Sequence, residues 1–167
     1  IKGWLAPESH APFLTLLQTL DALQDRKDVR GVLLKFSNFD GGWAQSEELR
    51  ARIVELKAKG KKVYAFLPFA DIRTYTIATA ADVIITTPTG GYDLTGPTTG
   101  SLHIKSFLDS VGVEAQFVTT GAFKTAPETF TKARPSAPIN QTQNSILDIL
   151  HNTARDLIAA GRKVPLT

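Results

Sequence analysis

The chain has 167 residues, close to the size of one domain, and 43% of them are hydrophobic, which is enough for a packed core. The 19 Lys and Arg against 16 Asp and Glu leave a formal net charge of +3, too small and too scattered for a nucleic-acid-binding surface. Cysteine is absent, which excludes disulfides and thiolate metal sites, and no metal-ligand spacing connects the three histidines.

The chain begins at an isoleucine, and we therefore expect it to be a piece of a longer protein. Its sequence contains no signal peptide and no apolar run long enough to cross a bilayer. Either feature could lie upstream of these residues in the parent protein.

Apolar periodicity predicts the first elements of the chain. Residues 1–5 form a short apolar run that suggests an edge strand, and apolar residues at 13–23 recur at helical spacing after a candidate N-cap at Ser9. Residues 31–36 are almost continuously apolar, as in a strand buried on both faces of a parallel sheet.

A double glycine, Gly41-Gly42, follows this strand. Glycines at the carboxyl end of a buried strand allow the backbone to approach a ligand, and their N–H groups could point at an oxyanion. The alternative is an ordinary strand-to-helix turn, which the local sequence favours. The helix that follows is expected to begin with an N-cap at Ser46 and to stop at Gly60.

The middle of the chain continues this alternation. Two further strands are expected, at 62–67 and at 83–86. Pro68 is expected to end the first, and residues 88–91 to form a loop after the second. Asp71 is a candidate cap for a helix that continues through 75–81.

The second half predicts an irregular connection at 94–100, a helix capped by Ser101, and a carboxyl-terminal helix at 139–160. Residues 161–167 would begin a linker. Alternating strands and helices predict an α/β fold with a mostly parallel sheet, repeated β-α units and outer helices, in a single domain over 1–167.

The stretch at 113–126 contains the candidate catalytic group. A strand is expected at 115–120, Gly121 breaks it, and Lys124 lies at the opening of a short helix. Apolar walls disfavour the charged form of an amine, and a neutral amine can accept a proton from a hydroxyl nucleophile. The alternative is a solvated surface lysine, which this stretch alone favours.

Taken together, these segments resemble the S49 serine peptidases, the signal peptide peptidase A or protease IV family, which has the Clp protease/crotonase fold. The resemblance extends over most of the chain, and four pieces in the same order carry it. They are the strand at 31–36 with Gly41-Gly42, the segment from Tyr75 to Ala80-Ala81-Asp82, the turn at 94–100, and Gly121-x-x-Lys124-Thr125-Ala126.

The chain departs from the family at the nucleophile. Where the family has Ser-Gly-Gly, this chain has Ile72-Arg73-Thr74, and isoleucine cannot act as a nucleophile. The resemblance therefore points to the amino-terminal half of the long, duplicated bacterial form, in which the other half supplies the serine.

The resemblance implies a Ser/Lys dyad with Lys124 as general base, supported by Thr125 unless that residue only begins a helix. It implies oxyanion or substrate contacts at Gly41, Gly42, Gly96 and Gly100, with no nucleophile, metal or cofactor in this chain. The implied partners are signal peptides, the serine-bearing half of the same protein and further copies in a ring. The parent would lie at the bacterial inner membrane with its catalytic domain on the periplasmic side, and this fragment would be soluble.

Two other functions share the fold. One is a crotonase-type enzyme that polarises an acyl-CoA thioester, and the other is a non-catalytic scaffold that binds peptides or assembles rings. We also expect an apolar surface around 68–75 and 96–100, including Leu67, Phe69 and Ile72, that faces a groove or a neighbouring domain.

Overall fold

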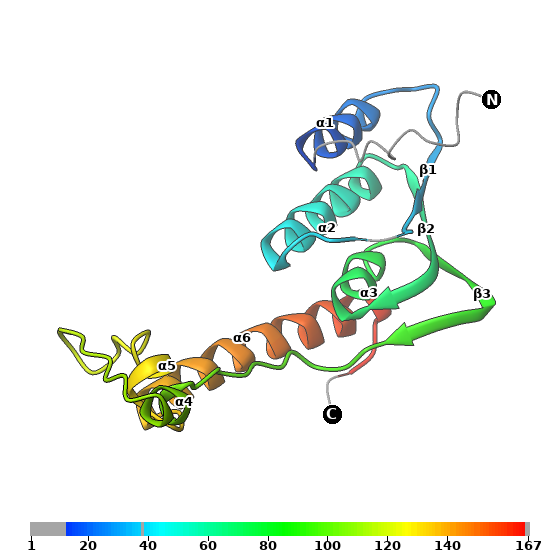
Figure 1. Cartoon of the computed structure of the whole chain (residues 1–167). Coiled ribbons are helices and arrows are strands. Elements are labelled where there is room, and N and C mark those ends of the chain that lie inside the picture. The colour runs from blue at the N-terminus through cyan, green and yellow to red at the C-terminus, as the bar shows by residue number, and fades with distance from the viewer. Residues whose placement is uncertain (1–12, 38, 166–167) are drawn as a thin grey trace, which may run out of the picture. The chain divides into compact units, whose positions relative to one another are not determined.

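A computed structural model describes residues 13–37 and 39–165 (Figure 1). The chain divides into two compact units: unit 1 runs to Thr95 and resumes at Ala154, and unit 2 comprises residues 96–153. The expected edge strand at 1–5 and the N-cap at Ser9 lie outside the described residues. The single domain over 1–167 stays a prediction.

Unit 1 contains a parallel sheet with the order β1-β2-β3. The strands are β1 (Gly31–Lys35), β2 (Lys62–Asp71) and β3 (Val83–Asp93). Leu34 pairs with Ala65, and Ala65 pairs with Ile84. The predicted α/β fold with a parallel sheet is confirmed.

Both longer strands extend beyond their predicted ends. Pro68 does not end β2, because the pairing with β3 shifts register between Leu67 and Phe69, and such an irregularity accommodates a residue without an N–H group. The predicted loop at 88–91 is part of β3. A Cβ at Gly90 would lie 2.8 Å from the Pro68 carbonyl oxygen, so this pairing requires a glycine there.

Three helices precede or connect the strands: α1 (Phe13–Gln24), α2 (Trp43–Ala58) and α3 (Ile72–Ala78). The expected N-cap at Ser46 is wrong, because α2 begins at Trp43 with Gly42 as its N-cap. Ser46 is instead buried in the first turn, where its hydroxyl donates to the Gly42 carbonyl at 3.1 Å. The stop at Gly60 is confirmed by its positive φ of 78°.

The cap of α3 is also confirmed, since the Asp71 carboxylate accepts a hydrogen bond from the Thr74 N–H at 2.8 Å. The helix ends at Ala78, earlier than the predicted 75–81, and Ala80 and Ala81 follow in turns closed by N–H bonds to carbonyls three residues back.

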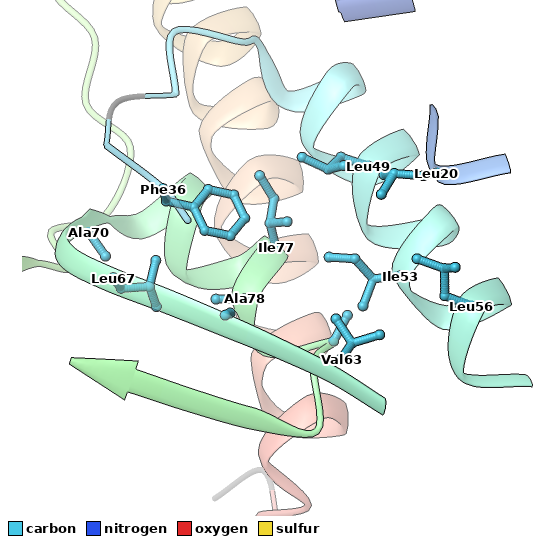
Figure 2. Close-up of a cluster of buried hydrophobic side chains, with 12 residues drawn as sticks. Leu20, Phe36, Leu49, Ile53, Leu56, Val63, Leu67, Ala70, Ile77 and Ala78 are labelled. Atoms are coloured by element: carbon cyan, nitrogen blue, oxygen red, sulfur yellow. The ribbon is translucent and has the colours of Figure 1, made fainter. Parts of the chain in front are cut away.

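The core of unit 1 lies between one face of the sheet and the helices (Figure 2). Alternate residues of β2 point into it and are fully buried, including Val63, Ala65 and Leu67. Ile53 of α2 and Ile77 of α3 meet them there. The expectation that Leu67 is exposed is therefore wrong, whereas Phe69 is 56% exposed as expected.

The opposite face of the sheet is open among the described residues of unit 1. Leu33 is 63% exposed, and its neighbours across the sheet, Tyr64 and Val83, are also exposed. The prediction that the strand at 31–36 is buried on both faces is wrong, because the helices that contact β2 lie against the other face. A continuous apolar run predicts that both faces of a strand are covered, but it does not show whether this chain or another chain covers them.

Unit 2 contains α4 (Lys105–Ser110), α5 (Glu128–Thr131) and the first part of α6 (Ala137–Arg162). The helix predicted from Ser101 begins later, at Lys105. The carboxyl-terminal helix is confirmed and extends two residues past each end of the predicted 139–160, so the expected linker cannot begin before 163.

The strand predicted at 115–120 is wrong. Residues 113–120 have no regular secondary structure in the part of the chain described, and they do not join the sheet of unit 1. A strand needs a ladder partner, and alternating apolar residues alone do not provide one. Phe117 instead stacks on Phe130, with ring centroids 5.7 Å apart.

Candidate functional site

Lys124 lies in a turn that connects the irregular stretch at 113–120 to α5. Gly121 has a positive φ of 93°, and its carbonyl accepts a hydrogen bond from the Lys124 N–H at 3.2 Å. The expected short helix at Lys124 is not formed, because α5 begins only at Glu128. The Lys124 side chain is exposed.

An open hollow of about 540 Å³ adjoins Lys124 and is lined by residues 118–120 and 123–127. Its walls are largely apolar and uncovered within unit 2, since Val118 is 102% exposed and Phe123 is also exposed. Thr125 lines the hollow beside Lys124, and its carbonyl accepts the Glu128 N–H at 2.9 Å. Thr125 therefore helps to begin α5, whereas support of the lysine stays a prediction.

Glu128 begins α5, the helix that follows the turn with Lys124. Its buried carboxylate accepts hydrogen bonds from the Ser136 hydroxyl at 2.6 Å, the Ser136 N–H at 3.1 Å and the Lys132 ammonium at 3.1 Å. The Ser136 hydroxyl is the main cause that holds the pKa of Glu128 below its usual range, against the opposing effect of burial. The carboxylate thus connects α5 to the start of α6.

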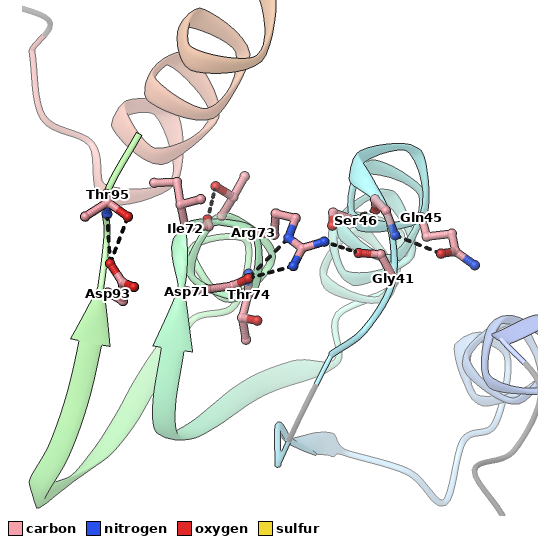
Figure 3. A network of polar contacts seen from close by, with 11 residues as sticks. Gly41, Gln45, Ser46, Asp71, Ile72, Arg73, Thr74, Asp93 and Thr95 are labelled. Atoms are coloured by element: carbon pink, nitrogen blue, oxygen red, sulfur yellow. Dashed lines mark hydrogen bonds and ion pairs between the residues drawn. The ribbon is translucent and has the colours of Figure 1, made fainter. Parts of the chain in front are cut away.

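The double glycine lies in unit 1 (Figure 3). The Gly42 N–H donates to the Gln45 side-chain oxygen at 2.9 Å, within its own helix start. The Gly41 carbonyl accepts from Arg73 Nη1 at 2.9 Å. The oxyanion role of these glycines stays a prediction, and in this conformation the Gly42 N–H already has a partner.

Arg73 joins two parts of unit 1. Its Nε and Nη2 atoms each lie 3.1 Å from Asp71 Oδ2, and its third contact is the Gly41 carbonyl in the β1–α2 loop (Figure 3). Burial alone would raise the pKa of Asp71, but the hydrogen bonds from Thr74 and Arg73 outweigh it and lower the pKa. Sequence reasoning identified Asp71 only as a helix cap and Arg73 only as a departure from Ser-Gly-Gly.

Ile72 occupies the first position of α3, where the resemblance would place the nucleophile. Its carbonyl accepts the Thr76 hydroxyl at 2.7 Å, an interaction internal to the helix. The side chain is half-buried. It offers no hydroxyl or thiol for covalent chemistry.

Gly96 and Gly100 lie in unit 2, in the irregular connection before α4. No atom lies within 4 Å of a Cβ built at Gly100, and the nearest to one at Gly96 is His151 Nδ1 at 3.7 Å. Neither position requires a glycine for packing. Their substrate contacts stay predictions.

The structure brings Lys124 and Thr125 together at the hollow of unit 2, and it brings Gly41 and Gly42 together in unit 1. Among residues 13–37 and 39–165, no group of three or more His, Asp or Glu side chains could hold a metal ion. Within the same residues, no helix has the length and apolar character to cross a membrane.

Comparison with known proteins places these features in a family. Residues 55–167 match the model of peptidase family S49. The chain is 26% identical to Protease 4 of Salmonella typhi over 154 residues, which is 90% of this chain and 25% of that protein. It is 26% identical over 93% of its length to a putative signal peptide peptidase SppA of Enterococcus faecium, and 23% identical over 81% to the chloroplastic serine protease SPPA of Arabidopsis thaliana.

The family match spans more than half of the chain and contains Ile72, the turn at 94–100 and Lys124. The fold and the match define an α/β protein of the Clp protease/crotonase class. The chain belongs to peptidase family S49. It spans 20% of the Arabidopsis relative, 25% of the Salmonella relative and 44% of the Enterococcus relative.

Proposed function

We propose that this chain is the amino-terminal catalytic half of a Ser/Lys signal peptide peptidase that hydrolyses apolar peptides such as cleaved signal peptides. Lys124 is the general base, and the serine nucleophile comes from another domain or subunit. The observation that carries the proposal is Lys124 on an open, apolar-walled hollow in a chain of the S49 family that has Ile72 at the nucleophile position.

The hollow explains why the lysine would need a partner. A general base must be neutral to accept a proton, and burial against apolar surface favours the neutral amine. Exposed Val118 and Phe123 offer such surface once another domain covers them. The chain's small share of the Salmonella and Arabidopsis relatives is consistent with a parent that contains that domain.

The assembly and location follow the same proposal. The parent forms a ring of several copies and lies at the bacterial inner membrane, with its catalytic domain on the periplasmic side. Two relatives are named as Protease 4 and as a putative signal peptide peptidase, which supports peptide substrates over the acyl-CoA esters of crotonase-type enzymes.

A scaffold without catalytic function is the second candidate, and Ile72 is the observation in its favour. In that case the parent would keep its peptide binding or its ring assembly after the loss of Lys124, and it would have no hydrolytic activity to lose.

The test is Lys124→Ala in the full-length parent. We expect the hydrolysis of apolar peptides to fall by about 10²- to 10⁴-fold, the usual effect of removing a general base. Folding should be intact because the side chain is exposed and leaves no core cavity. Peptide-cleavage kinetics and a melting curve measure the two effects.

Lys105→Ala is the matched control, because Lys105 is also in unit 2 and its ammonium pairs at the surface with Asp109. That variant should cleave at the wild-type rate. A Lys124→Ala parent that retains the wild-type rate would show that another group is the base. A wild-type parent that hydrolyses no peptide at all would favour the scaffold.

A further inference from the structure

The contacts of Arg73 form a defined arrangement that neither the family match nor the proposed dyad uses. Two oxygen acceptors from separate parts of unit 1, the Gly41 carbonyl and the Asp71 carboxylate, converge on one guanidinium group. The arginine and aspartate side chains are only 34% and 31% exposed. A planar guanidinium with donors on several sides suits this arrangement, whereas a lysine ammonium is a single point charge.

We propose that Gly41 and Asp71 form an internal guanidinium-binding site, which Arg73 occupies. This contact fixes the double-glycine turn so that the Gly41 carbonyl, and not the Gly42 N–H, is directed at the Ile72–Thr74 segment. We call Gly41, Asp71 and Arg73 the guanidinium clamp. The inference about the turn rests on the proposed function, in which this segment replaces the nucleophile of the family.

The Asp71 side of the clamp is held from two directions. Its Oδ2 atom accepts hydrogen bonds from Nε and Nη2 of Arg73, and its Oδ1 atom accepts one from the Thr74 N–H. The carboxylate therefore has a fixed orientation and a full negative charge near neutral pH, as its lowered pKa also indicates.

The Gly41 side is held as well. A Cβ at Gly41 would lie 2.3 Å from Phe39 Cζ, which shows how closely the aromatic ring covers the glycine. The next N–H, that of Gly42, is directed to Gln45. The turn is therefore fixed by the Phe39 ring, by Gln45 and by Arg73.

The polarity of the turn has a chemical consequence. An oxyanion hole needs N–H donors aimed at the oxygen that becomes negative. Here the group directed to the α3 segment is an acceptor, and a carboxylate lies on the other side of the guanidinium. Without the arginine, two oxygens would face the same space, so the site selects a cation and not an anion.

The test is chemical rescue of Arg73→Ala in this chain. We expect the variant to melt several degrees lower than the wild type, and guanidinium chloride at low millimolar concentration to restore part of the loss. These concentrations are far below the molar range that unfolds proteins. Sodium chloride and methylammonium chloride at equal ionic strength should restore less, because neither ion has the planar fork.

Arg155→Ala is the matched control, because Arg155 pairs with Asp156 at the surface and has no second acceptor from another element among its described contacts. Guanidinium should not raise its melting temperature. The double variant Asp71→Asn with Arg73→Ala should not be rescued either, because it lacks the carboxylate.

Equal effects of guanidinium and sodium on Arg73→Ala would overturn the proposal, and so would an Arg73→Lys variant as stable as the wild type. If Arg73→Ala does not fold, the comparison of Arg73→Lys with the wild type decides, and we expect the lysine variant to melt at a lower temperature. The clamp is tested by melting temperatures, and the Ser/Lys proposal is tested by peptide hydrolysis. A negative result for the clamp therefore leaves the Ser/Lys proposal untouched. A negative result for Lys124 as the base likewise leaves the clamp untouched.

Discussion

Glu128 is a buried carboxylate that lies close in sequence to the candidate base. It lies four residues after Lys124, and it receives the Ser136 and Lys132 donors across the α5–α6 connection. Its position follows from a turn closed by the bond from its own N–H to Thr125. The start of α5, just after the segment with Lys124, is therefore held by a residue with no role in the proposed chemistry.

The lowered pKa of Glu128 predicts a pH dependence. The stabilisation is fully present above the ordinary glutamate pKa of about 4.3 and is lost as the pH falls through the lower value of the folded protein. We expect the Ser136 amide to exchange faster with solvent below that range. Hydrogen exchange measured against pH tests this.

Glu128→Gln is the control for that titration. The amide keeps the size of the side chain but does not ionise, so the Ser136 exchange rate should lose this acid-dependent step. An identical acid step in the variant would assign the effect to another group.

At the scale of elements, the last turns of α6 pack against the end of α3. A Cβ built at Gly161 would lie 2.3 Å from the Thr79 carbonyl oxygen and 2.7 Å from the Thr79 Cβ. Backbone atoms cannot move aside as a flexible side chain can. A glycine within this helix therefore reflects close packing between two elements.

We expect Gly161→Ala to destabilise the chain by about 1 to 3 kcal/mol, as overpacking usually does. The sign of this change in the free energy of unfolding is informative, because alanine is a better helix former than glycine by about 1 kcal/mol. Without the close packing, Gly161→Ala would therefore stabilise α6. A urea titration gives the free energy of unfolding.

Gly100→Ala is the comparison, since nothing lies within 4 Å of its Cβ position. That change should leave the free energy of unfolding within about 0.5 kcal/mol of the wild type. A stabilised Gly161→Ala variant would show that α6 does not pack against Thr79 in this way.

The elements also show what the sequence could predict. Strand and helix order, the Asp71 cap and the Gly60 stop were predictable, because local residue chemistry determines them. The length of β2 was not predictable, since a proline at a register shift and a proline at the end of a strand give the same sequence pattern. The absence of a strand at 115–120 was also not predictable, because a strand forms only where another strand can pair with it, and local sequence does not show that partner.

In the candidate site, too, local features were predictable from the sequence and contacts between distant residues were not. The motif made Lys124 a candidate, but it could not predict the open hollow beside the lysine, because apolar residues after a predicted strand imply a covered lysine. The link from Arg73 to Gly41 joins residues 32 positions apart, a contact that no local pattern in one sequence reveals.

At the scale of the whole molecule, the chain contains serines but lacks one at the family's nucleophile position. Ser101 is the most informative of these, because its hydroxyl oxygen lies 3.1 Å from His103 Nε2. The other ring nitrogen of His103 contacts the Glu128 and Lys132 carbonyls, which ties the connection before α4 to α5. This pairing accounts for the histidine structurally.

We therefore expect this chain alone to remain unlabelled by a serine-directed fluorophosphonate probe, because Ile72 replaces the nucleophile. Mass spectrometry after probe treatment measures the labelling, and the full-length parent should be labelled in its other half. Stoichiometric modification of Ser101 or Ser37 in this chain would contradict the split site.

The buried Arg50 has a consequence for how the chain becomes folded. Its guanidinium donates to the Thr76 carbonyl, the Thr79 hydroxyl and the Leu157 carbonyl, and the last of these lies 107 residues away. All of unit 2 is synthesised between β3 and that last partner. The Thr76 and Thr79 contacts of Arg50 can form as soon as α3 has been made, whereas its Leu157 contact has to await the synthesis of unit 2, so the hydrogen bonding of this buried guanidinium is completed in two separate steps.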